Sequence, residues 1–164
     1  MLRLALREES TLLKHVRDGF AAVKNTHREY FDQAIRTDFA DSLELDEALR
    51  KGHEQEKRWD YLLGHAPSCE IVAVEPHSAR QDQVASVIKK QTAARAQLRT
   101  HLREGKRVTR WLWVASGRVH FADTEKTRRL LDQNGILFVG ARVAAKHLPA
   151  PRSVSKTKPA RKWL

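Results

Sequence analysis

The sequence predicts an α/β fold in which N-terminal helices precede a small mixed sheet flanked by helices, with an α+β arrangement as the alternative. Three observations support this prediction: a strand hairpin over residues 59–74, an amphipathic helical pattern over 78–103 and a strongly β-forming run over 107–116. A helix between two strands is typical of a parallel crossover. We therefore expect part of the sheet to be parallel.

The chain has 164 residues, which suits one domain with a core of ordinary size. We expect this domain to span residues 1–148, with a helical part at about 10–52 and a sheet-containing part at about 57–146. Residues 149–164 contain three prolines and five Lys or Arg without an acidic side chain. This composition predicts a disordered basic tail.

Three helices are expected before the first strand. Apolar residues at helical spacing follow Ser10 and continue to Val23, and a second stripe runs from Tyr30 to Phe39. Asp41 and Ser42 are capping residue types ahead of a third short pattern that ends at Gly52. These stripes predict a helical N-terminal part.

Two apolar runs, Trp59–Leu63 and Ile71–Val74, flank a Gly-His-Ala-Pro-Ser break and predict a β-hairpin. Asp60 lies near the start of the first run and Glu75 at the end of the second, so strand pairing brings the two carboxylates to one edge of the sheet. Alternation along the strand places Glu75 and His77 on the same face.

A helix should follow the hairpin directly. Ser78 is a good N-cap with Gln81 at the capping-box position, and the apolar spacing continues to about Arg103 before Gly105. The remaining elements are expected in this order: a central strand at Arg107–Ser116 buried on both faces, a short edge segment at Arg118–Phe121, a helix capped by Asp123 or Thr124 that ends at Asn134-Gly135, and a strand at Ile136–Val143.

Charge is distributed unevenly along this basic chain, whose net charge is +11. Residues 1–57 carry ten Lys or Arg against twelve Asp or Glu, whereas residues 80–110 carry nine against two. Such a concentration favours a surface that binds nucleic acid over the alternative of a solubilising surface. The candidate phosphate contacts are Arg80, Lys89, Lys90, Arg95, Arg99, Lys106, Arg107 and Arg110.

The spacing of the acids in the hairpin matches a known sequence pattern. Asp60 is followed, after fourteen intervening residues, by Glu75-Pro76-His77 at the end of a strand, and a helix comes next. This pattern resembles the PD-(D/E)xK, or restriction-endonuclease-like, nuclease superfamily, in which an Asp begins one strand and an acid-x-Lys ends the next. The likeness spans about residues 43–143. Here His77 stands where the family has Lys, and Trp59 where it has Pro.

The resemblance implies a restriction-endonuclease-like fold and metal-dependent hydrolysis of phosphodiesters, with Asp60 and Glu75 as ligands of Mg²⁺ or Mn²⁺. In some members of the family a lysine from the following helix fills the Lys role, and Lys89 and Lys90 are the candidates here. His77 would orient the water, act as a general base or bind the metal. Glu44 and Glu47 are weaker candidates for an extra acid, because acids in a first turn also complement the helix dipole.

Other functions stay open at this point. Asp60 and Glu75 are also plain acids at strand ends, so the alternative is a catalytically inactive nuclease-like module that binds nucleic acid or a protein partner, such as an inhibitor or antitoxin-type subunit. The sequence leaves the oligomeric state open. No Gly-x-Ser-x-Gly motif supports a serine hydrolase, and Cys69 beside Glu70 is a poor nucleophile.

The cellular environment is also constrained by the sequence. One cysteine, no secretory signal pattern and no apolar run long enough for a membrane helix together predict a cytoplasmic protein.

Overall fold

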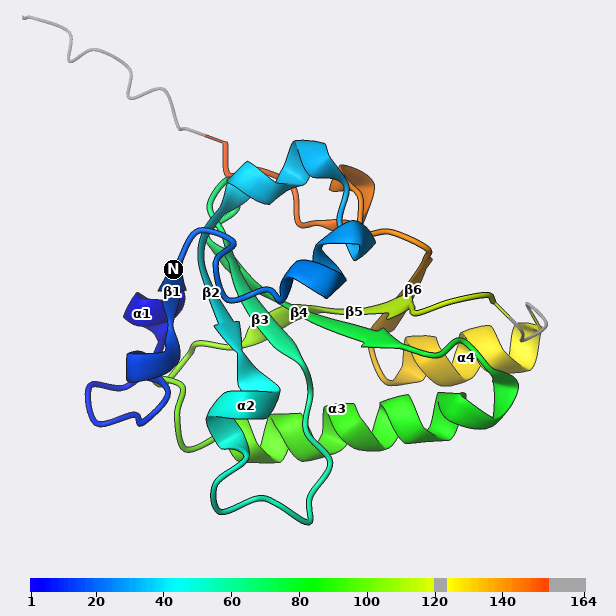
Figure 1. The fold of residues 1–164 in the computed structure, drawn as a ribbon, viewed down its shortest axis with the longest axis horizontal. Helices are drawn as coiled ribbons and strands as arrows, with labels where there is room; N and C mark the ends of the chain where they lie inside the picture. Colours follow the sequence, from blue (N-terminus) through cyan, green and yellow to red (C-terminus); the bar gives the residue numbers. More distant parts are fainter. Residues whose placement is uncertain (120–123, 154–164) are drawn as a thin grey trace, which may run out of the picture.

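The computed structural model describes residues 1–119 and 124–153. A six-stranded sheet in the order β1-β2-β3-β4-β5-β6 forms its centre (Figure 1). The strands are β1 (Arg17–Asp18), β2 (Phe39–Glu44), β3 (Tyr61–His65), β4 (Glu70–His77), β5 (Val108–Ala115) and β6 (Ile136–Gly140). The α-helices are α1 (Leu2–Ala5), α2 (Leu45–Leu49), α3 (Val84–Leu98) and α4 (Glu125–Gln133). The 3₁₀ helices are η1 (Leu13–His15), η2 (Asn25–Tyr30), η3 (Gln33–Asp38), η4 (Gln81–Gln83) and η5 (Ala145–His147).

The sheet is mixed, as predicted. Strands β1 to β4 pair antiparallel in sequence order, whereas β5 pairs parallel with both β4 and β6. Helix α3 connects β4 to β5, and α4 connects β5 to β6. The α/β fold and the parallel crossovers are therefore confirmed.

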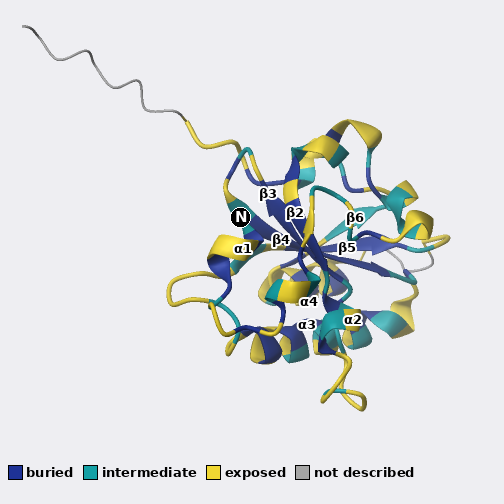
Figure 2. Ribbon diagram, turned by 60° about the vertical axis from the view of Figure 1, so that its left-hand side comes forward, coloured by how far each residue is buried: buried dark blue, intermediate teal, exposed yellow. Residues whose placement is uncertain are grey.

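Each face of the sheet carries its own apolar cluster, because side chains alternate along the strands. Ala73 and Trp113 lie in the cluster that contains Val87 of α3, and the numbered α-helices supply that layer. Val72 and Val74 lie in the opposite cluster, which contains Phe31. Figure 1 shows α2, α3 and α4 on one side of the sheet and the short helices of residues 25–38 on the other, and Figure 2 shows the buried strands between them.

The hairpin of β3 and β4 is present, with Tyr61 opposite Val74. The run from Trp111 to Val114 in β5 is buried throughout, which agrees with the expected burial on both faces. Strand β5 lies second from one edge of the sheet, between β4 and β6.

The predicted long N-terminal helices are wrong. Gly19 adopts φ +56°, which a continuing helix does not tolerate, and Arg17 pairs with Ser42 in the sheet instead. The residues of the second stripe form η2 and η3, and Phe39–Glu44 form a strand because they pair with β3. Most of the large apolar residues of both stripes are still buried or partly buried, but in turns that cover the sheet.

The start of the N-terminal segment is fixed by one buried carboxylate. Asp41 accepts hydrogen bonds from the backbone N–H groups of Leu2 at 2.9 Å and Arg3 at 3.2 Å. Gly64 of β3 lies directly against this carboxylate, so a Cβ at that position would collide with it. The contact explains why a glycine occurs inside a strand.

The helix after the hairpin is shorter than predicted at both ends. Ser78 does not cap it; the chain forms η4 first, and α3 begins at Val84. The helix ends at Leu98 because the following residues pair with the start of the chain, through a bridge between Leu6 and Leu102. This pairing over a long sequence separation overrides the helical spacing that continues to Arg103.

The C-terminal elements follow the predictions closely. Thr124 caps α4 through a 3.2 Å hydrogen bond from the Thr127 N–H, and Gly135 follows the helix at φ +65°. Strand β6 ends at Gly140, earlier than expected, because Val143 leaves it to bridge Phe31. The expected segment at 118–121, the cap at Asp123 and most of the basic tail lie wholly or partly outside the described residues.

No helix among residues 1–119 and 124–153 is long and apolar enough to cross a membrane.

Candidate active site

Asp60 and Glu75 meet at one edge of the sheet, as the hairpin prediction required. The backbone N–H of Asp60 donates a 2.8 Å hydrogen bond to Oε2 of Glu75. Pairing of β3 with β4 stops at Val74, and Pro76 has no N–H to continue it. The Glu75 side chain thus replaces the next rung of the ladder and fixes the start of β3.

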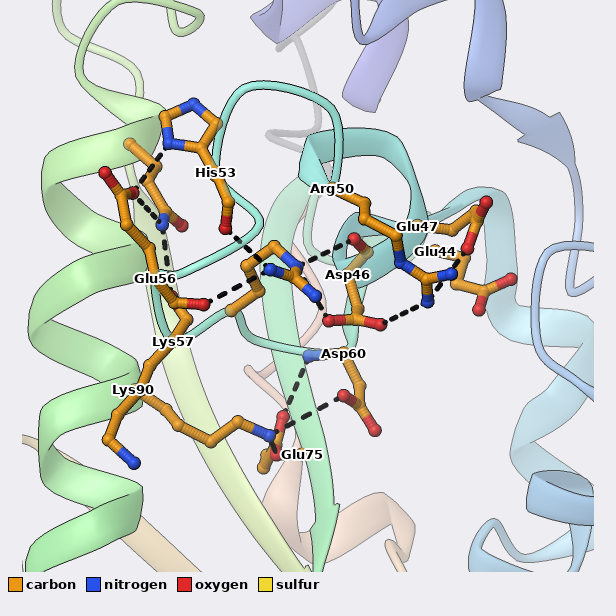
Figure 3. Close-up of polar contacts among 12 residues, drawn as sticks. Glu44, Asp46, Glu47, Arg50, His53, Glu56, Lys57, Asp60, Glu75 and Lys90 are labelled. Atoms are coloured by element: carbon orange, nitrogen blue, oxygen red, sulfur yellow. Dashed lines mark hydrogen bonds and ion pairs between the residues drawn. The ribbon is translucent and has the colours of Figure 1, made fainter.

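Lys90 is the lysine that α3 directs at this pair. Its Nζ forms an ion pair with Oε1 of Glu75 and lies 3.8 Å from Oδ1 of Asp60 (Figure 3). The Lys90 side chain is 18% exposed and that of Glu75 is 0% exposed. Val87 and Ala94 share the buried face of α3, and Lys90 lies three residues after one and four before the other. Its neighbour Lys89 is exposed on another face of the helix and makes no contact with either carboxylate.

His77 lies on the same face of β4 as Glu75. Its Nδ1 is 3.6 Å from Oε1 of Glu75, and its Nε2 lies 2.9 Å from Oε1 of Gln83. Since both neighbours are acceptors, they favour an imidazole that carries protons on both nitrogens. The Glu75 carboxylate first, and the Gln83 amide after it, raise the pKa of His77 against the opposing effect of burial.

Two carboxylates share one lysine at the site. Burial, and then the neighbouring Glu75 carboxylate, raise the pKa of Asp60 from its usual value to about 7, although Lys90 acts against this rise. A further cation close to Asp60 would favour its ionised form. The geometry thus places two carboxylates, one of them with a raised pKa, around one lysine and beside His77.

The donor chemistry fits Mg²⁺ or Mn²⁺. Both ions prefer carboxylate oxygens, and Mg²⁺ keeps several waters, so Asp60 and Glu75 would suffice as protein ligands. Oε1 of Glu75 would then be shared with, or released by, Lys90. In the described part of the chain no three His, Cys, Asp or Glu groups converge on a common metal position. The remaining ligands would have to be water or substrate oxygens.

Glu44 and Glu47 are engaged elsewhere. Glu44 pairs with Lys24 at 3.0 Å, and Glu47 pairs with Arg50 at 3.1 Å. Figure 3 shows both on the far side of Asp46 from Glu75. The structure does not bring them to the two carboxylates.

The predicted phosphate contacts do not form one surface around the site. Arg80, at the start of η4, pairs with Asp82 at 3.4 Å, and Lys89 is exposed on α3. Lys90 lies in the site itself, and the other five predicted residues line a pocket at the opposite end of β4 and β5: Arg95, Arg99, Lys106, Arg107 and Arg110. The basic stretch of sequence therefore divides into two places in the fold.

Two residues that the sequence did not indicate support His77. Gln83 bonds its imidazole, and the indole N–H of Trp113 donates a 3.1 Å hydrogen bond to the His77 carbonyl. Trp113 pairs with Glu75 in the parallel register of β4 and β5. The role of Trp113 beside His77 could have been predicted only from this strand register, which cannot be read from the sequence.

Comparisons with protein-family models, with curated proteins and with solved structures gave no match. The protein is therefore classified by its architecture alone. It is an α/β protein in which two acids and a lysine meet at one end of the central strands of a mixed sheet.

Proposed function

We propose that this chain hydrolyses phosphodiester bonds of nucleic acid in a metal-dependent reaction, with Asp60 and Glu75 as metal ligands and Lys90 as the accompanying cation. The observation that carries the proposal is the convergence of Asp60, Glu75 and Lys90 from β3, β4 and α3 on one point. Arg50 also pairs with two acids, Asp46 and Glu47, but all three of those side chains are partly exposed, whereas the Glu75 side chain is 0% exposed.

Each residue has a role that follows from its position. A bound Mg²⁺ would supply a water of lowered pKa and neutralise charge on the phosphate. Lys90, with three N–H donors at the boundary of the buried pair, would bind a phosphate oxygen as negative charge develops there. His77, which is 21% exposed and held by Gln83, would add a second positive group or donate a proton to the leaving oxygen.

A cleavage assay with matched lysine variants tests this proposal. The purified chain is incubated with single- and double-stranded DNA and RNA in Mg²⁺, Mn²⁺ or EDTA. We expect cleavage that requires metal and falls at least about 100-fold in Glu75→Gln and in Lys90→Met. Lys89→Met removes the same charge from the adjacent, exposed position and should retain activity. Cleavage that persists in Glu75→Gln would refute the assignment of the site.

A second candidate function is a nucleic-acid-binding module without catalysis. It is favoured by the ion pair itself, since Lys90 already contacts Glu75 where a metal would bind and the Glu75 side chain is 0% exposed. Paramagnetic broadening of the Asp60 and Glu75 amide resonances by Mn²⁺ separates the two candidates. Binding of nucleic acid without broadening or cleavage would favour the module, and neither binding nor cleavage would favour a protein partner.

A further inference from the structure

A basic pocket lies at the end of α3 away from the candidate active site. It has a volume of about 750 Å³ and lies where α3 ends and β5 begins. Glu70 of β4 lines the pocket, whereas Glu75 of the same strand belongs to the candidate active site. Five residues of strand at about 3.3 Å each separate Glu70 from Glu75 by roughly 17 Å. The pocket is therefore a separate feature of the surface.

Seven of its lining residues are Lys or Arg, against two acids, Glu70 and Glu104. The seven cations come from three segments of the chain: the N-terminal segment, the end of α3, and the loop that leads into β5. Arg7 joins the others because Leu6 bridges Leu102 and the Arg7 N–H donates 2.8 Å to the His101 carbonyl. The tertiary structure thus gathers more cations than the basic stretch of sequence supplies.

Some of these cations are held in place by the protein. Arg7 and Arg103 each donate a 2.9 Å hydrogen bond from Nε to a backbone carbonyl, of Leu102 and Leu6 respectively. The Arg95 guanidinium lies 5.4 Å from the centre of the Trp111 ring. Fixed side chains lose little entropy when they bind an anion, which favours affinity.

Other cations of the pocket lack partners. Within residues 1–119 and 124–153, the side chains of Arg99, Lys106, Arg107 and Arg110 make no hydrogen bond or ion pair, and all four are exposed. The negative end of the α3 dipole accounts for a basic residue such as Arg99, but Lys106, Arg107 and Arg110 lie beyond the helix. Unpaired like charges around one hollow repel each other, and a polyanion would relieve that repulsion.

The C-terminal part of the described chain adds charge beside the pocket. The Arg152 N–H donates 2.9 Å to the Pro67 carbonyl, and Arg152 lines a neighbouring depression that shares Lys106 and Arg107 with the pocket. By sequence, residues 154–164 contain four more Lys or Arg and no acidic side chain.

We infer that this pocket binds the phosphate backbone of a nucleic acid strand, at a position separate from Asp60 and Glu75. It deepens the proposed function, since it supplies the affinity that the active site, with two carboxylates, does not. At about 3.4 Å per nucleotide along a B-form strand, the separation of roughly 17 Å corresponds to about five nucleotides. A strand held in the pocket would thus place a bond about five nucleotides away near the site.

The test measures binding without cleavage. Fluorescence anisotropy of labelled 30-nucleotide single- and double-stranded DNA and RNA is followed in EDTA over a series of salt concentrations. The pocket variant combines Arg99→Ala, Arg107→Ala and Arg110→Ala. The control combines Lys14→Ala, Lys51→Ala and Arg142→Ala, three exposed cations outside the pocket with the same loss of net charge. Circular dichroism and thermal melts establish that both variants are folded.

We expect the pocket variant to bind nucleic acid at least about 10-fold more weakly than the wild-type chain at about 100 mM salt. In a plot of log affinity against log salt concentration, the magnitude of its slope should decrease by about one for each phosphate contact removed. The control should keep most of the wild-type affinity and slope. Equal weakening of both variants, unchanged binding by the pocket variant, or no binding by the wild-type chain would each overturn the inference. Because metal is absent, failure of cleavage leaves this result unaffected, and the two proposals fail separately.

Discussion

Oε2 of Glu75 accepts a hydrogen bond from the backbone N–H of Asp60, and Oε1 of Glu75 forms an ion pair with Lys90. The Glu75 side chain is 0% exposed. One buried carboxylate therefore links the first residue before β3, the end of β4 and the middle of α3. Removal of either partner would leave a buried polar or charged group without compensation.

Lys90→Met should destabilise the fold by about 3 kcal/mol at pH 7.5, because the buried Glu75 carboxylate loses its counter-charge. Lys89→Met, at the exposed neighbouring position, should change the free energy of unfolding by less than about 0.5 kcal/mol. Urea denaturation of both variants measures the difference. The double variant Glu75→Gln/Lys90→Met should recover part of the loss. Equal stability of the two single variants would show that the ion pair contributes nothing.

Asp60→Asn should stabilise the protein, and more so as the pH rises. The pKa of Asp60 is raised to about 7 in the fold, so the folded state holds a proton that the unfolded state has released from about pH 4 upward. Stability contributed by this group is thus lost between about pH 4 and pH 7. Thermal melts at pH 4.5 and pH 8 should show a gain for the variant that is larger at pH 8 by about 2–4 °C. A gain independent of pH would contradict the raised pKa.

The pKa of His77 should depend on both of its acceptors, and more strongly on Glu75 than on Gln83. Glu75 is the larger cause of its raised pKa and Gln83 the smaller, so the pKa should fall in Gln83→Leu and fall further in Glu75→Gln. The chemical shift of the imidazole Cε1 proton against pH measures each value. His101, whose pKa is lowered by burial elsewhere in the fold, serves as the internal control and should keep its value in Gln83→Leu.

Asp41→Ala should destabilise the protein by about 1–3 kcal/mol, because the N–H groups of Leu2 and Arg3 lose their buried acceptor. Asp38→Ala, an acid at the end of η3 outside this contact, is the control and should change stability by less than about 0.5 kcal/mol. Chemical denaturation compares the two. A variant at position 41 as stable as the control would mean that α1 is held by its apolar contacts alone.

The parts of the fold that local patterns specify could be predicted. The hairpin, the carboxylate pair at its open end, strand β5 and the end of α4 all depend on neighbouring residues or on a short turn. The selection of Lys90 over Lys89 depends on the phase of α3 against the sheet, and the sequence offered both. Helical phase is fixed only by packing, in this case by Val87 and Ala94.

The failed predictions share one physical cause. Residues 12–39 have helical apolar spacing, but their burial comes from turns laid across the sheet, and β1 and β2 form because their partners lie farther along the chain. Likewise, the end of α3 and the place of Arg7 are set by the bridge between Leu6 and Leu102. Pairing between distant segments overrides local propensity and leaves no mark in a short window of sequence.

The bridge between Leu6 and Leu102 also bears on the order of folding. Residues 1–7 are synthesised before both of their partners, Asp41 and the segment 101–103. The bridge from Leu6 therefore forms only after Leu102 has been made, and contacts over such sequence separations form slowly. The basic pocket, which needs Arg7 as well as the loop into β5, would be among the last surfaces to assemble on a newly made molecule.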